Sequence, residues 1–297
     1  MRWYADWGFQ FVKIYNSVPP AWVRPLAEEA HRLGLRVMGH VPAFMSAERA
    51  ILDGYDEINH VNQLMLGFII DSSREDTRTT FRFTALGERA GSLDLGGDEV
   101  RRVVALMRER GVALDATISI FQQLLLSAPG EMAPNDAGWL GHMPATVQRQ
   151  RRKGQVNRPA GQEAAYRASW EKLLALLGEL HEAGIRIVPG TDNTPGFMLH
   201  SELEALALAA IPRAEVLQIA TCGTARHLGV EQDRGVIEAG RAADFLLVDG
   251  DPTKDMADIR KVRMAVARGD VHYPPEIHEA MGMRSFAAKP PLGAVKH

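Results

Sequence analysis

The chain contains one cysteine, no long apolar run and no large excess of charge of either sign. Cys222 has no partner for an intrachain disulfide and lies in a helical pattern without CxxC spacing, so we interpret it as a small buried hydrophobe. No apolar run approaches the roughly 18–20 residues that span a bilayer. A net charge of −3 gives neither the basic footprint of a nucleic-acid-binding protein nor an acidic tail. We therefore expect neither a membrane nor a nucleic acid as a partner.

Two common motifs are absent as well. No GxGxxG turn follows the first strand pattern, so dinucleotide binding has no support. The N-terminal segment lacks the apolar stretch of a signal peptide. A signal that was lost with an upstream segment would leave no trace, so a cytoplasmic and a periplasmic or secreted location both stay open. The basic run at 149–153 is interpreted as a solvated loop, with a phosphate or partner contact as the alternative.

Strand and helix patterns alternate over most of the 297 residues. Apolar, β-branched runs predict strands at 10–16, 35–41, 57–61, 113–119 and 185–189. Helical spacing predicts helices at 21–33, 46–52, 98–110, 162–183, 201–210 and 213–228. This alternation indicates an α/β fold with a parallel sheet and right-handed crossovers. Five strands do not close a barrel that normally needs eight, so an open doubly wound sheet is the physical alternative to a partial barrel.

Two long segments interrupt the alternation. Residues 62–97 and 128–161 are less regular, and the polar stretch 71–82 is interpreted as a surface loop or lid. On the rim of a barrel, loops of this length would shape a substrate pocket. Residues 235–249 predict two short strands joined by a glycine-centred turn, and 261–268 predicts a further strand. The tail from Tyr273 onward is expected to be loosely structured.

Side chains that can bind a metal follow four of the predicted strands. His40, His60 and Asp192 each come where a short apolar strand breaks into a loop, and Lys13 lies near the end of the first strand. The carboxyl ends of parallel strands share one rim, where active sites of barrels are built. Imidazole nitrogen and carboxylate oxygen suit a divalent metal that keeps an open position for water. One histidine after a strand is more often structural, but four such ends favour a metal-dependent hydrolase.

Lys13 is the unusual member of this set, because its cation repels a metal. A lysine that is desolvated among apolar neighbours becomes partly neutral and nucleophilic, and it can then add CO2 to form a carbamate. A carbamate is an anionic oxygen ligand that can bridge two metals. A lysine paired with an acid and a Schiff-base lysine are the two alternatives.

As an ordered series, these motifs resemble the amidohydrolase superfamily of metal-dependent TIM-barrel hydrolases. Within it, the resemblance is closest to imidazolonepropionase-like proteins and to prolidase-like dipeptidases with a carboxylated lysine. It extends over about residues 8–272 and is carried by the segments 13–15, 39–41, 59–61, 190–192, 200–204, 220–229 and 235–248.

The resemblance implies a fold and a metal centre. The chain would form about strands four to eight of a (β/α)8 barrel (1–230), a small C-terminal β-sandwich segment (231–273) and a loose tail (274–297). Carboxylated Lys13 would bridge two divalent ions, with zinc favoured over manganese, iron or cobalt. His40 and His60 would bind the second ion. Asp192 would bind the first ion and act as the catalytic general base.

The resemblance also implies a substrate class. A small-molecule amide, cyclic amide or dipeptide would be hydrolysed at a C–N bond. Whether the chain forms a homo-oligomer stays open. Tyr15 would contact the substrate, unless its ring only packs on the rim. His200 would shape the pocket, with capping of the following helix as the alternative.

The sequence departs from the family's pattern at its beginning. The family's first strand carries a His-x-His pair, whereas the twelve residues before Lys13 include no histidine. We therefore expect an N-terminally truncated chain that starts at an internal methionine and has little or no activity by itself. The alternative to a hydrolase is a catalytically impaired fragment or a non-enzymatic binding module.

Overall fold

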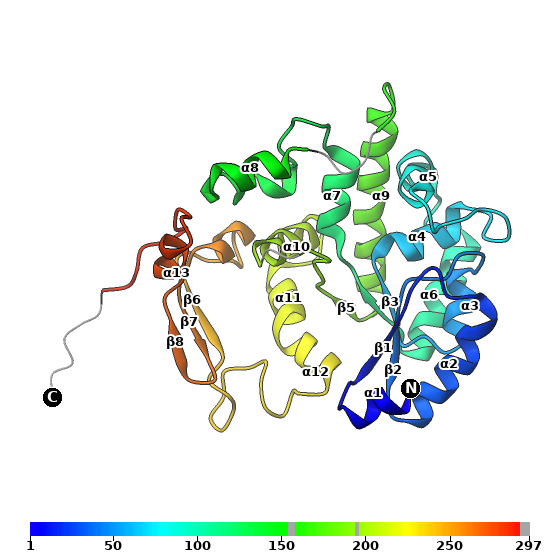
Figure 1. Cartoon of the computed structure of the whole chain (residues 1–297), viewed down its shortest axis with the longest axis horizontal. Helices are drawn as coiled ribbons and strands as arrows, with labels where there is room; N and C mark the ends of the chain where they lie inside the picture. Colours follow the sequence, from blue (N-terminus) through cyan, green and yellow to red (C-terminus); the bar gives the residue numbers. More distant parts are fainter. Residues whose placement is uncertain (154–157, 194–195, 292–297) are drawn as a thin grey trace.

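The computed structural model describes residues 1–153, 158–193 and 196–291. Part of the segment predicted at 128–161, the end of the predicted tail and His297 lie outside the described residues. A five-stranded parallel sheet forms the centre, with its strands in sequence order. They are β1 (Phe11–Ile14), β2 (Arg36–Gly39), β3 (Glu57–Asn59), β4 (Ala113–Asp115) and β5 (Ile187–Val188). The prediction of an α/β fold with a parallel sheet is confirmed (Figure 1).

Helices follow the strands where the sequence supplies helix starts and stops. α2 (Pro20–Arg32) begins with a proline, and its buried Val23, Ala27 and Ala30 are spaced to share one helix face. α3 (Ala47–Leu52) begins after Ser46, whose side chain accepts a hydrogen bond from the backbone of Arg49. α6 (Asp98–Arg110) ends at a left-handed glycine, and α9 (Glu163–Glu182) is the longest helix of the described chain. These four elements agree with the predicted helices to within about two residues.

The segment 62–97 is more regular than predicted. It contains α4 (Val61–Ile69) and α5 (Phe81–Arg89), followed by a short 3-10 turn. α4 escaped prediction because the side chains of its first six residues are all buried, which removes the polar face that marks an amphipathic helix. The polar stretch between these helices is a loop that ends at Thr80, so the predicted lid is shorter than expected.

The predicted strand 113–119 is also too long. β4 ends at Asp115, and α7 (Ile118–Leu126) begins three residues later. The apolar pattern continues through this junction, but the backbone N–H groups of Ile118 and Ser119 donate to the carboxylate of Glu202 instead of to a neighbouring strand. A residue distant in sequence therefore converts the end of this run into a helix.

The second long segment holds α8 (Ala145–Arg151) and two 3-10 turns. The expectation of a solvated basic loop is wrong for Arg151, which pairs at 2.7 Å with the fully buried carboxylate of Asp136. Further on, α10 (Phe197–Leu208) begins four residues before the predicted start. The helix predicted at 213–228 is interrupted by a π-helical turn between α11 (Arg213–Gln218) and α12 (Thr224–Leu228).

The C-terminal part forms a separate antiparallel sheet of three strands. They are β6 (Phe245–Val248), β7 (Val262–Ala267) and β8 (Asp270–His272). The strand predicted before β6 is not found among the described residues, where Ile237 is 86% exposed and no neighbouring strand pairs with it. The tail expected to be loose begins with α13 (Pro274–Ala280), which places two prolines in its first turn.

A few short helices complete the described chain: α1 (Arg2–Asp6) before β1 and the 3-10 turn Met256–Arg260 before β7. None of the helices in the described ranges has both the length and the apolarity to cross a bilayer.

Candidate active site

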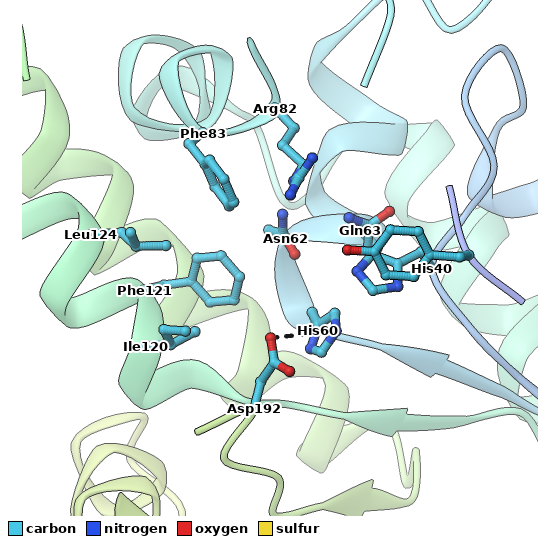
Figure 2. A pocket seen from close by; sticks show the side chains of 11 residues that line it. His40, His60, Asn62, Gln63, Arg82, Phe83, Ile120, Phe121, Leu124 and Asp192 are labelled. Carbon is cyan, nitrogen blue, oxygen red and sulfur yellow. Dashed lines mark ion pairs between the residues drawn. The ribbon is translucent and has the colours of Figure 1, made fainter. Parts of the chain in front are cut away.

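A cavity of about 150 Å³ opens at the carboxyl ends of the parallel strands (Figure 2). A cavity of this size accommodates a group about as large as a benzene ring. One wall is polar and the other is apolar. The polar wall consists of His40, His60, Asn62, Gln63, Arg82 and Asp192, with Tyr15 at its edge; the apolar wall consists of Phe83, Ile120, Phe121 and Leu124.

Two buried imidazoles lie at the base of the polar wall. The ring centroids of His40 and His60 are 4.6 Å apart, and the two side chains belong to residues that are 7% and 5% exposed. Burial lowers the pKa of His40 to about 3, with His60, Lys13 and Arg82 contributing further. Burial likewise lowers the pKa of His60 to about 4, with smaller effects of Lys13 and Arg82. Both rings are therefore neutral near pH 7 and keep a lone pair.

Each imidazole presents a nitrogen that has no hydrogen-bond partner in the described part of the chain. These atoms are Nδ1 of His40 and Nε2 of His60. The other ring nitrogen of His60, Nδ1, lies 2.8 Å from Oγ1 of the buried Thr117. When Nδ1 carries the proton, it donates a hydrogen bond to Oγ1 of Thr117, and Nε2 presents its lone pair to the cavity.

Asp192 faces this lone pair from the neighbouring loop. Its Oδ2 lies 4.0 Å from Nε2 of His60, and its side chain is 54% exposed. The loop reaches this place because Gly190 lies directly against the buried carboxylate of Asp115. A Cβ at position 190 would lie 1.9 Å from Oδ1 of Asp115, so only glycine fits there.

Gly39 has a related role before His40. A Cβ at this position would lie 2.0 Å from the carbonyl oxygen of Ile14, and its φ of +137° is rarely adopted by other residues. The backbone N–H of His40 donates to that same carbonyl, and the hydroxyl of Tyr55 donates to the carbonyl of His40. The glycine therefore permits the close strand pairing that fixes the backbone of His40.

The remaining residues singled out in the sequence are placed differently. Tyr15 lines the cavity, with its ring centroid 4.2 Å from that of His40 and the residue 49% exposed. Lys13 is exposed on β1 and does not line the cavity, so the desolvation suggested by the sequence is not found. His200 also lies outside the cavity. It is in the first turn of α10, whose N-cap is Gly196, so His200 does not cap this helix.

Four functional candidates were missed in the sequence. Asp115 and Thr117 follow a strand run just as His40 and His60 do, and that signal was available. Glu202 carried no comparable signal, because it bonds to residues that are distant in sequence, and Arg82 carried none, because it follows no predicted strand. Burial raises the pKa of Asp115 well above its usual value, with the charges of Glu57 and Glu202 adding to the effect.

The family model for the amidohydrolase family matches residues 13–271 of this chain. The chain belongs to the amidohydrolase family. Its similarity to the imidazolonepropionase of Deinococcus radiodurans is 38% identity over 84 residues, covering 27% of this chain and 21% of that protein.

Solved structures of amidohydrolases and dipeptidases share its fold. A bottromycin amidohydrolase superposes with a TM-score of 0.63 at 19% identity, covering 97% of this chain and 64% of that one. A Xaa-Pro dipeptidase with methionine bound in its active site gives a TM-score of 0.57 at 19% identity, covering 92% and 56%. This chain therefore spans between about half and two thirds of the length of these solved chains.

Amidohydrolases are generally metal-dependent, and a divalent ion needs nitrogen or oxygen donors from the side chains of the cavity. Among the described residues, no group of three or more His, Cys, Asp or Glu side chains is placed to hold a metal. The two neutral imidazoles with unpartnered nitrogens and the Asp192 carboxylate nevertheless have suitable donor types and protonation states. The chemistry of these three side chains therefore fits a divalent metal, but the ligand set needs a further donor.

Proposed function

We propose that this amidohydrolase hydrolyses a C–N bond in a small amide, cyclic amide or dipeptide with the help of a bound divalent metal. The observation that supports this most directly is the pair of buried, neutral histidines, each with an unpartnered ring nitrogen, of which Nε2 of His60 faces Asp192. Buried polar atoms without partners are unfavourable, and they are common where a ligand completes the site.

The residues have distinct roles in this proposal. His40 Nδ1 and His60 Nε2 would hold the metal, with Asp192 as a third donor. When bound, zinc, manganese, iron or cobalt supplies activated water and polarises the scissile carbonyl. The Asp192 carboxylate would take a proton from that water and deliver it to the leaving nitrogen, as a general base and then a general acid. Its half-exposed position leaves it accessible for this proton transfer.

Carboxylation of Lys13 is a separate proposal with its own test. A carbamate at Lys13 would add an anionic oxygen donor and allow a second metal to bind. The exposed position of Lys13 does not favour the neutral amine that reacts with CO2, so bound metal would have to stabilise the product.

The finer description of the fold belongs to the same proposal. We propose that β1–β5 correspond to about strands four to eight of a (β/α)8 barrel (1–230). β6–β8 would be a segment of a β-sandwich (231–273), followed by the tail (274–297). The superpositions on the Xaa-Pro dipeptidase and the bottromycin amidohydrolase support this assignment. They cover 92–97% of this chain but only 56–64% of the solved chains.

A non-enzymatic binding module is the second candidate. It is favoured by the incomplete ligand set among the described residues. Metal content separates the two functions, measured by elemental analysis of the purified 297-residue chain and of His60→Ala. His181→Ala is the matched control, because His181 pairs with Glu215 on the helices far from the cavity. We expect at least about one ion per chain, lost only in His60→Ala, together with amide or dipeptide hydrolysis that is much slower than is usual for an enzyme and is lost with the ion. Bound metal without turnover would favour the binding module, and absence of metal would refute the proposed function.

A further inference from the structure

Arg82 contributes a cation to the cavity that has no carboxylate partner in the described part of the chain. It lies in the first turn of α5, and Figure 2 shows its guanidinium pointing from above into the space between Phe83 and His40. Nearby arginines are paired: Arg78 with Asp76 at 2.7 Å and Arg89 with Glu75 at 2.9 Å. The guanidinium of Arg82 differs from these in facing the cavity without a counter-ion.

The contacts of Arg82 leave much of its donor capacity free. Its Nη1 lies 3.3 Å from the backbone carbonyls of Thr77, Arg78 and Thr79, which is long for a hydrogen bond. The guanidinium carbon lies 4.4 Å from the ring centroid of Phe83, so the group packs against this ring. Nε and Nη2 form no hydrogen bond with any residue that the structure describes. A planar guanidinium with free donors matches the geometry of a carboxylate.

The rest of the cavity indicates what else a ligand would carry. Opposite the polar wall, Phe83, Phe121 and Leu124 form an apolar surface.

We propose that Arg82 binds a carboxylate of the substrate and thereby selects amides that carry a free carboxylate beside an apolar group. Small N-acyl amino acids and dipeptides have this chemistry. This inference rests on the proposed function and narrows its substrate class. The scissile carbonyl would lie toward His40, His60 and Asp192, while the carboxylate would lie beside Arg82 and the apolar group against Phe121.

A purely structural role for Arg82 is the alternative, in which it holds the loop of Thr77 through the three carbonyl contacts. A pair of ligands that differ only in charge separates these roles. We would measure the binding of 3-phenylpropionate and of 3-phenylpropanamide to the whole chain by isothermal titration calorimetry. The variants are Arg82→Gln, Arg82→Lys and, as a matched control, Arg78→Gln, which removes the same charge from the same segment but outside the cavity.

The unmodified chain and Arg78→Gln should bind the carboxylate at least about tenfold more tightly than the amide, as a charge-assisted hydrogen bond would give. Arg82→Gln should bind the two ligands equally, and Arg82→Lys should keep part of the preference. Thermal unfolding of each variant shows that the fold is intact. Equal binding by the unmodified chain, no binding of either ligand, or a preference that survives in Arg82→Gln would overturn the proposal.

Failure of this inference is distinguishable from failure of the proposed function. A chain that holds metal and hydrolyses amides without preferring the carboxylate refutes the role of Arg82 alone. The opposite result is a chain that prefers the carboxylate through Arg82 but neither holds metal nor hydrolyses amides. It would support the ligand site at Arg82 and refute the proposed hydrolase function.

Discussion

The hydroxyl of Thr117 lies 2.8 Å from Nδ1 of His60 and thereby leaves the opposite ring nitrogen to face Asp192. Thr117 adopts a left-handed backbone conformation with φ of +43°, directly before α7. The carboxylate of Glu202 receives the first N–H groups of that helix at 2.9 Å and 2.8 Å. A buried acid on α10 thus holds the turn that carries Thr117 and thereby helps to orient His60.

Thr117→Val should weaken metal binding, because the hydroxyl that orients His60 is lost while the side-chain shape is kept. Loss of such an orienting hydrogen bond typically costs about 10- to 100-fold in metal affinity. Zinc titration with a competing chelator measures the change. Thr117→Ser should retain most of the affinity because it keeps the hydroxyl. Unchanged affinity in Thr117→Val would show that this contact does not orient a ligand.

Gly190→Ala should destabilise the fold, because its Cβ would overlap the buried carboxylate of Asp115. We expect the free energy of unfolding to fall by about 1–3 kcal/mol, as is usual for overpacking a buried site. Urea denaturation gives this value. Gly196→Ala is the control, since an added Cβ meets no atom within 4 Å there. Equal stability of both variants would contradict the tight approach of Gly190 and Asp115.

Glu202→Gln should change how stability depends on pH. Burial raises the pKa of Glu202 from its usual 4.5 to about 7, although the N–H groups of Ser119 and Ile118 oppose the shift. The folded chain therefore holds a proton on Glu202 that the unfolded chain releases. This stabilising contribution is complete below about pH 4.5 and is lost as the pH rises through about 7.

The glutamine variant carries no titrating group at this position. Relative to Glu202→Gln, the unmodified chain should lose stability between pH 5 and pH 8, by an amount on the order of 3 kcal/mol. Urea denaturation at both pH values measures it, with Glu171→Gln, an exposed position on α9, as the control. Parallel pH profiles of the unmodified chain and Glu202→Gln would count against the raised pKa.

Bicarbonate should raise the metal content of the unmodified chain if Lys13 forms a carbamate. Lys13→Arg keeps the positive charge but cannot be carboxylated in this way, so its metal content should not respond. Elemental analysis after dialysis with and without bicarbonate provides the measurement, and Lys172→Arg on α9 is the control. A response that persists in Lys13→Arg would assign the effect to another group.

Much of the fold was predictable because its signals are local. The end of β1 and the loop after β5 were located from short apolar runs that break into polar loops, and the carboxyl ends of parallel strands share one rim. His40, His60 and Asp192 were accordingly expected near one another, and all three line the cavity. By contrast, α4 was missed because burial on all sides hides a helical period.

What the sequence determined by itself is the order of strands and helices, the parallel sheet and the strand ends that carry His40, His60 and Asp192. These features depend on residue periodicity and on glycines that lie within a few positions of the strand ends. Only the tertiary structure decided that Arg82 points into the cavity, that Lys13 stays exposed and that Glu202 supports Thr117. Contacts between residues that are tens of positions apart depend on how whole elements pack, and no local pattern records them.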